Sequence, residues 1–376
     1  MLLSEDHRAV QEAVRQYVQA EIAPHAAAWD KSSAFPAAPL KGLAALGCYG
    51  VAVPTELDGA GLDTLALALI IEEIAAGDGA TSTIVSVTNC PVNSILLGFG
   101  NADQQERFLR PLARGDMLGA FCLTEPHVGS EAGGLKTTAV RDGDHYVLNG
   151  VKQFITSGKN GDLAIVMAVT DKAAGKRGIS AFLVPTATPG YQVARLEDKM
   201  GQHASDTAQI LFEDCRVPAA NLIGSEGQGL KIALSGLEGG RIGIASQAVG
   251  MARAAFECAL AYAKQRQAFG KPIFEHQAVQ FKLAEMATQI EAARQLIWHA
   301  ACLKDAGLPC LKEAAMAKLN ASEMAEAVCS AAIQVLGGYG YVSDFPVERI
   351  YRDVRVCQIY EGTSEVQKIL IGRALA

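Results

Sequence analysis

The sequence predicts an α+β protein with an N-terminal helical domain, a middle antiparallel β-barrel or sandwich domain, and a C-terminal four-helix bundle. Apolar residues recur at helical spacing in both terminal thirds, and short β-like runs separated by turn signals occupy the middle. At 376 residues, the chain also exceeds the size at which one hydrophobic core usually stops growing. The predicted domains cover residues 1–118, 119–225 and 226–376.

The first domain is predicted to begin with an amphipathic helix. Ser4 is a good N-cap, the apolar residues of 10–18 fall on one face, and Pro24 ends the pattern. A second periodic stretch covers 65–74, and Glu72 and Glu73 lie off its apolar stripe.

The middle domain is predicted to consist of short strands joined by tight turns. Asp142-Gly143 and Asn149-Gly150 are both hairpin dipeptides, so we expect a turn at each. The predicted strands cover residues 137–140, 145–148, 151–156, 163–169, 179–184, 191–196 and 208–212.

Helical periodicity returns in the C-terminal domain. Apolar residues from Val279 to Ile297 recur at spacings of four and three, which predicts one long amphipathic helix. Three further helices, at 230–264, 310–336 and roughly 365–375, would complete a four-helix bundle. Thr363 or Ser364 is expected to cap the last helix.

Composition excludes several classes of function. The net charge of −7 and the lack of a basic stripe argue against a nucleic-acid partner. Nine scattered cysteines without a CxxC pair or metal-ligand spacing predict free thiols in a reducing compartment and no metal site. The acidic start resembles neither a signal nor a transit peptide, and no uninterrupted apolar run reaches about 18 residues. We expect a cytoplasmic protein without a membrane span.

A candidate catalytic carboxylate lies near the C-terminus. Glu361 stands between an aromatic residue and Gly362, directly before the predicted final helix. Glycine allows close approach of the backbone to a ligand, and a carboxylate held there is suited to general-base chemistry. From this segment alone, a solvated loop glutamate is the alternative.

Several different motifs occur along the chain, one after another. They are Phe121–Ser130, Asn149–Gly158, Arg266–Pro272, Glu275–Ala278, Gln334–Tyr341, Arg352-Asp353 and Tyr360–Thr363. In order and spacing, the chain resembles the acyl-CoA dehydrogenase family over essentially its whole length. The resemblance implies the three domains above and a homotetramer with one FAD per subunit. No GxGxxG motif follows a first strand, so a Rossmann site for FAD is not supported.

The reaction implied by the resemblance is α,β-desaturation of an acyl-CoA thioester. Glu361 matches the family's usual base for the α-proton, the β-hydride passes to flavin N5, and electron-transfer flavoprotein is the implied acceptor. A minority of the family places its base directly before the arginine that matches Arg241, but this chain has Gly240 there. This absence favours Glu361, with Glu238 as the residue to test as a control. Burial is expected to raise the pKa of Glu361.

The resemblance also implies the residues that bind FAD. Thr124 and Thr156 match hydroxyls near flavin N1 and N5, and Phe154 replaces the tryptophan that most relatives carry. Other cofactor contacts implied for the flavin and diphosphate are Phe121, Leu123, Ser130, Thr363 and Glu365. The contacts implied from a neighbouring subunit are Arg266 and Gln277, and Gly337 and Gly338 fit the same site. Phe269 and Gln334 are two further implied cofactor contacts. Ordinary alternatives remain for several of these: strand threonines, a turn serine, a surface arginine and a glycine helix cap.

The implied substrate contacts surround the candidate base. They are Ser130, Glu238, Arg241, Tyr360 and Gly362. Glu238 stands where the family commonly has aspartate, which keeps the charge but lengthens the side chain by one methylene.

Two other functions remain open at this point. One is an oxidase on the same scaffold, although the glutamate base argues against the nitroalkane branch, and acyl-CoA oxidases are generally much longer. The other is a non-catalytic member that binds acyl-CoA or serves as a scaffold, which predicts a lost base or broken FAD motifs.

Overall fold

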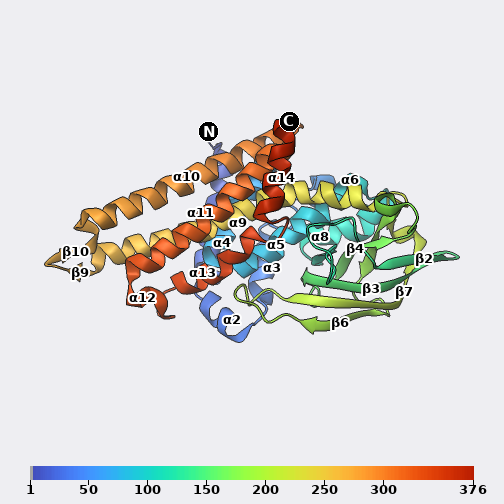
Figure 1. Ribbon diagram of the computed structural model, residues 1–376, viewed down its shortest axis with the longest axis horizontal. Helices are drawn as coiled ribbons and strands as arrows, with labels where there is room; N and C mark the ends of the chain where they lie inside the picture. The colour runs from blue at the N-terminus through green and yellow to red at the C-terminus, as the bar shows by residue number, and fades with distance from the viewer. Residues whose placement is uncertain (1–2) are drawn as a thin grey trace.

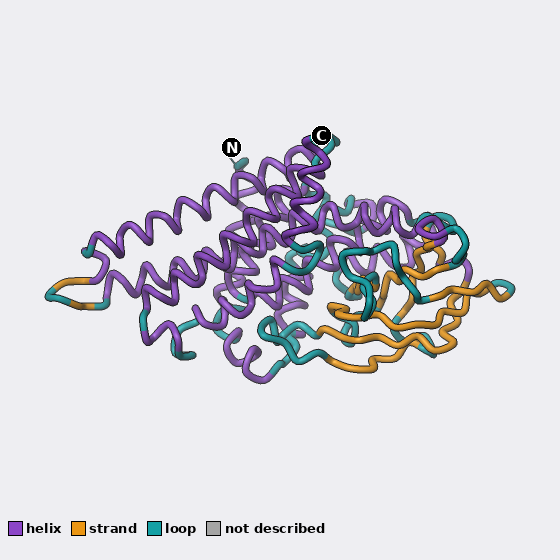
Figure 2. The backbone as a smooth tube through the Cα atoms, viewed as in Figure 1, coloured by secondary structure: helices purple, strands orange, loops and turns teal. Residues whose placement is uncertain are grey.

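The computed structural model describes residues 3–376 and places helices and strands in different parts of the molecule. Figure 2 shows the large sheet gathered at one end of the long axis and a small isolated hairpin at the other, with helices between them. The predicted order of helical, β and helical parts is therefore confirmed.

The N-terminal part is helical. Ser4 caps the first helix by accepting the His7 N–H at 3.1 Å, as predicted. The helices are α1 (Glu5–Glu21), α2 (Ala26–Ser32), α3 (Ala37–Ala45), α4 (Thr64–Gly77), α5 (Gly79–Val87), α6 (Ser94–Phe99), α7 (Ala102–Gln104) and α8 (Arg110–Arg114). The π-helical turn Thr88–Asn93 joins α5 to α6.

Helix α4 is buried on almost every side, because α1, α9 and α10 all pack against it. Glu72 and Glu73, which lie off the apolar stripe, are therefore buried rather than solvated. Arg294 pairs with Glu72 at 2.9 Å, and Arg253 pairs with Glu73 at 2.6 Å. The helical spacing located the stripe but not the second layer of helices that covers the opposite face.

One helical stretch, Gly79–Phe99, is long and apolar enough to cross a membrane by length and composition. Inside the protein, 78% of its most apolar window is buried, as is typical of a core helix. All nine cysteines are free thiols, and most are buried.

The middle part is a mixed sheet with strand order β6-β7-β3-β2-β4-β5-β8, and β1 pairs with β4. The strands are β1 (Gly119–Cys122), β2 (Thr138–Asp142), β3 (His145–Thr156), β4 (Leu163–Val169), β5 (Ile179–Pro185), β6 (Tyr191–Leu196), β7 (Thr207–Pro218) and β8 (Leu222–Ile223). Most pairs of this sheet are antiparallel, as predicted, but β1–β4 and β2–β4 are parallel, so the sheet is mixed.

Of the two predicted hairpin turns, one forms. Residues Asp142 and His145 end and begin adjacent antiparallel strands, so the first dipeptide makes a turn. Asn149-Gly150 instead lies inside β3, at a bulge opposite β7. Asn149 exchanges hydrogen bonds with Asp214 of β7, and a Cβ at Gly150 would lie 2.6 Å from Thr137 Oγ1. These contacts between strands keep the dipeptide in the ladder.

The C-terminal part is the predicted bundle, formed by α9 (Gly229–Gln265), α10 (Gln277–Asp305), α11 (Leu311–Leu336) and α14 (Ser364–Leu375). The periodic residues of α10, including Leu283, Met286 and Ile290, are buried in its core. Shorter helices α12 (Gly338–Tyr341) and α13 (Val347–Val354) follow α11. The hairpin β9 (Gln267–Ala268) and β10 (Lys271–Pro272) projects at the far end from the large sheet (Figure 1).

Replacing Leu69 of α4 by alanine is expected to destabilise the protein by about 2–5 kcal/mol, because Leu69 is fully buried where α4 packs against the bundle. Urea unfolding monitored by circular dichroism measures the change. The matched control is Leu375→Ala, since Leu375 is 73% exposed and should change the unfolding free energy by less than about 0.5 kcal/mol. Equal effects of the two substitutions would contradict the prediction.

Candidate active site

Glu361 lies in a tight turn between α13 and α14. Its φ is 52° and that of Gly362 is 94°, so both adopt left-handed backbone conformations. The Tyr360 N–H donates to the Val356 carbonyl at 3.1 Å on one side, and Thr363 caps α14 on the other. The turn brings the Glu361 carboxylate against the backbone of α9.

Gly240 of α9 provides the space for this carboxylate. A Cβ added at Gly240 would lie 1.9 Å from Glu361 Oε2, which no real pair of atoms tolerates. The two positions at which the family's base is expected therefore meet at one point in the structure. A carboxylate can stand on Glu361 only because position 240 carries no side chain.

The electrostatic environment of Glu361 suits a base. Burial raises the pKa of its carboxyl to about 7, although Arg241 and Lys318 act in the opposite direction. Its Oε2 is buried and has no hydrogen-bond partner among the described residues. Arg241 Nε and Nη1 are buried and unpartnered within the same part of the chain. Buried polar atoms normally have partners, so this group of atoms marks a place that a bound molecule would complete.

Tyr360, the neighbour of Glu361, is anchored by a buried polar chain. Its hydroxyl donates to Gln247 Oε1 of α9, and Gln247 Nε2 donates to Ser82 Oγ of α5 at 2.9 Å. Gln247 also donates to Thr83 Oγ1, which in turn donates to Gln202 Oε1 at 2.6 Å. Hydrogen bonds thereby connect the segment that contains Glu361 to α9, α5 and the loop after β6.

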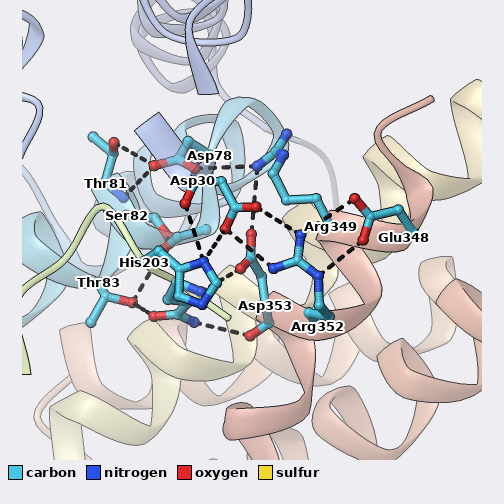
Figure 3. Close-up of polar contacts among 12 residues, drawn as sticks. Asp30, Asp78, Thr81, Ser82, Thr83, His203, Glu348, Arg349, Arg352 and Asp353 are labelled. Carbon is cyan, nitrogen blue, oxygen red and sulfur yellow. Dashed lines mark hydrogen bonds and ion pairs between the residues drawn. The ribbon is translucent and has the colours of Figure 1, made fainter. Parts of the chain in front are cut away.

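Figure 3 shows the ion pairs at the end of this hydrogen-bond series, away from Tyr360. Arg349 of α13 contacts Asp78 at 3.2 Å and Asp353 at 3.5 Å, and all three side chains are buried. Burial raises the pKa of Asp353 to about 7, against the opposing effect of Arg349. Asp30 of α2 accepts from Arg352 at 2.7 Å and pairs with His203 at 2.8 Å. Residues of the N-terminal, middle and C-terminal parts therefore meet beside Gln202, the last residue of the hydrogen-bond series from Tyr360.

The residues implied for the flavin ring come together at the ends of β1 and β3. The Gln153 N–H donates to the Thr124 carbonyl at 2.8 Å, so Thr124 lies beside the strand that carries Thr156. A bulge between Lys152 and Ile155 gives Phe154 a φ of 60° and turns it outward, leaving it 62% exposed. Phe121 and Leu123 belong to the same strand end, and Leu123 is buried. The result is an exposed aromatic side chain flanked by two threonines.

A buried ion pair that the sequence reading missed supports this strand end. Lys152 Nζ donates to Glu125 Oε1 at 2.8 Å and to the Leu123 carbonyl at 3.2 Å. Burial opposes the charge on Glu125, but Lys152 and the N–H groups of Lys136 and Thr137 hold the pKa of that carboxyl below its usual range. Lysine is rarely fully buried without a partner. The position of Lys152 within the predicted strand that also carries Phe154 was the feature from which a buried ion pair could have been predicted.

The residues implied for the adenosine end lie elsewhere. A cavity of about 620 Å³ is lined by Arg266, Gly337 and Gly338 together with Tyr262 and Tyr339. A Cβ at either glycine would meet no atom within 4 Å, so both border open space. The remaining residues of this group are Gln334 near the end of α11, Phe269, which is 96% exposed, and Gln277 at the start of α10.

These two groups lie at opposite ends of one chain. Figure 1 places α12 and the β9–β10 hairpin at one end of the long axis and β3 toward the other. A single chain therefore does not bring Arg266 and Phe154 to one dinucleotide. The donor types still fit FAD: an aromatic side chain and hydroxyls for the ring, and a guanidinium with open glycine backbone for the diphosphate.

The other implied residues occupy ordinary positions around the site. Ser130 is exposed in the loop after β1, and Glu365 is exposed in the first turn of α14. Thr363 is the N-cap of α14, accepting the Val366 N–H at 3.4 Å. Glu238 of α9 accepts from Cys310 Sγ at 3.5 Å, and its negative charge acts on Arg241.

Comparison with known proteins agrees with this geometry. Family models for the acyl-CoA dehydrogenase N-terminal, middle and C-terminal domains match residues 4–116, 120–215 and 227–376. The chain is 48% identical to the mitochondrial short-chain specific acyl-CoA dehydrogenase of Rattus norvegicus over 369 residues, covering 98% of this chain and 90% of the rat protein.

Solved structures show the same similarity. Butyryl-CoA dehydrogenase from Megasphaera elsdenii superposes with a TM-score of 0.98 at 42% identity, covering 100% of this chain and 99% of the other. A chain in a structure described as the electron transferring flavoprotein of Acidaminococcus fermentans gives a TM-score of 0.97 at 44% identity, covering 100% and 99%. The site, the fold and these similarities together show that the chain belongs to the acyl-CoA dehydrogenase family, whose members are FAD-dependent oxidoreductases.

Proposed function

We propose that the protein oxidises a short straight-chain acyl-CoA thioester to its α,β-unsaturated product, with Glu361 as the base that takes the α-proton. The observation that carries this proposal is the Glu361 carboxylate, whose Oε2 is buried and without a partner among the described residues, together with the unpartnered Nε and Nη1 of Arg241. A carboxyl whose pKa is raised to about 7 exchanges protons effectively near neutral pH.

The residues of the chain prepare the substrate for proton removal. The turn at Glu361 and Gly362 fixes the carboxylate, and the Glu361 N–H is proposed to polarise the thioester carbonyl. Arg241 offers buried donors to the CoA portion, and Tyr360 borders the acyl group. Thr124, Thr156 and Phe154 would hold FAD, which when bound supplies the hydride acceptor that no side chain provides.

Close packing around Glu361 supports a short acyl group. Where α9 faces α5 and the Thr88–Asn93 turn, a Cβ at Gly239 would lie 3.2 Å from Cys90 Sγ, and one at Gly243 would lie 2.7 Å from Ser86 Oγ. A Cβ at Gly236 would lie 2.7 Å from Pro91 Cβ. The helices that border the base therefore leave little room between them. The short-chain and butyryl-CoA specificities named for the relatives support the same choice.

A homotetramer is proposed as the working assembly. The flavin-ring residues and the adenosine residues lie at opposite ends of each chain, so one FAD would need residues of two copies. Electron-transfer flavoprotein is proposed as the acceptor, supported by the similar chain found in the Acidaminococcus fermentans structure.

Glu361→Gln is expected to keep the yellow flavin and to slow its reduction by butyryl-CoA by at least about 10²–10⁴-fold. In the wild type, the reduction rate should rise as pH increases through about 7, because the carboxyl must lose its proton before it acts as a base. Anaerobic stopped-flow bleaching measures both. Glu238→Gln is the control for a base on α9. Near-normal flavin reduction in Glu361→Gln would refute the assignment of Glu361 as the base.

Gly240→Ala is expected to slow flavin reduction by about 100-fold, because the new methyl group would displace the Glu361 carboxylate from its place. The matched control is Gly98→Ala in α6, where an added Cβ meets no atom within 4 Å. The flavin spectrum of each purified variant checks that FAD is retained. Unchanged reduction in Gly240→Ala would show that the carboxylate acts from another position.

Among straight acyl-CoAs of increasing length, butyryl-CoA is expected to reduce the flavin at least about tenfold faster than octanoyl-CoA, because the packing around the base excludes the longer chain. The measurement is kcat/KM with an artificial dye, in parallel with oxygen consumption. Octanoyl-CoA as the better substrate would contradict the assignment of a short acyl group. Fast turnover with oxygen alone would favour the oxidase alternative.

A further inference from the structure

Lys318 of α11 is a buried cation that the proposed chemistry does not use. Its side chain is fully buried, and Nζ donates to the Gly362 carbonyl at 2.8 Å. Within residues 3–376, Nζ forms no ion pair within 4 Å. Burying a charge without a direct counter-ion is costly, so its place beside the catalytic turn calls for a function.

The hydrogen bond from Lys318 acts on a turn in an unfavourable conformation. Glu361 adopts a φ of 52°, which a residue with a side chain rarely takes. Gln367 Nε2, also fully buried, donates to the Glu361 carbonyl at 3.2 Å and to the Gly362 carbonyl at 2.8 Å. Lys318 of α11 and Gln367 of α14 therefore both donate to the Gly362 carbonyl, and these two hydrogen bonds stabilise the turn.

The titratable groups around the Glu361 carboxylate come from three elements. Arg241 approaches from α9 and Lys318 from α11, and both favour the ionised carboxylate. Cys90, from the Thr88–Asn93 turn, is also near, but burial raises its pKa to about 12, so it carries no charge at neutral pH. Lys318 is thus one of two cations that balance the burial of the base.

Lys318 in turn lies among several titratable groups. Burial lowers its pKa to about 8, while Cys357, Glu361 and Glu323 favour its protonated form and Arg241 opposes it. The Glu361 carboxylate therefore favours the protonated form of Lys318, and the Lys318 ammonium favours the ionised form of Glu361.

We propose that Lys318 is a positioning residue for the base: its ammonium fixes the Gly362 carbonyl, and its charge keeps the Glu361 carboxylate ionised. This rests on the proposed role of Glu361 as the base. The hydrogen bond and the charge are separable, because glutamine retains an N–H donor without the charge and methionine removes both.

The test is the pH dependence of flavin reduction by butyryl-CoA in holoenzyme variants. Lys318→Gln is expected to raise the midpoint, with a near-normal rate at high pH, since loss of a nearby positive charge disfavours the ionised carboxylate. Lys318→Met should show the same shift and also a rate lowered about tenfold or more at high pH, because the turn loses a hydrogen bond. The control is Lys312→Gln, an α11 lysine paired with Glu313 on the surface.

A second readout does not depend on turnover. The infrared band of the protonated Glu361 carboxyl, identified by its loss in Glu361→Gln, should persist to higher pH in Lys318→Gln. An unshifted band and an unshifted midpoint in Lys318→Gln would overturn the proposal, as would failure of that variant to retain FAD, which would assign Lys318 to folding. Failure of the proposed function is distinct, because Glu361→Gln would then reduce its flavin normally.

Discussion

The site depends on one contact: the Glu361 carboxylate lies against the bare backbone of α9 at Gly240. The contact shields Glu361 Oε2 from water, and burial is the main reason why the pKa of this carboxyl rises to about 7. It also requires a left-handed turn at Glu361 and Gly362, which α14 and α11 hold from outside. A side chain at position 240 would take the place of the Glu361 carboxylate, which would then lose both its position and its raised pKa.

The scaffold around this contact is polar as well as apolar. Tyr360 is linked through Gln247 to α5. The ion pairs of Arg349 and Arg352 join α13 to the helical N-terminal part, where Asp30 also pairs with His203 of the loop after β6 (Figure 3). Buried polar groups of this kind require good geometry from every partner. They therefore fix the segment that carries Glu361 relative to α5, α9 and α2.

Separation of the implied FAD contacts constrains the assembly. The strand end with Thr124, Phe154 and Thr156 and the cavity with Arg266 belong to different ends of the chain. Each chain thus carries the proposed base and, at each end, one part of the implied cofactor site. The proposed tetramer would supply the other half, which explains why an open glycine-lined cavity and an exposed Phe269 occur far from Glu361.

Much of this protein follows from the sequence by itself. Helical and strand periodicity predicted the bundle and most strands, because local spacing records which face is buried. The motifs also indicated Glu361 and Arg241 as candidates, and the structure places them near each other. Tertiary structure alone decided that Glu72 and Glu73 are buried, that Asn149-Gly150 stays in a strand, and that Lys318 lies behind the base. Each of these depends on contacts between segments far apart in the chain, which local patterns do not record. A second layer of helices covers Glu72 and Glu73, and a partner strand holds Asn149-Gly150. The Gly362 carbonyl of the turn accepts a hydrogen bond from Lys318.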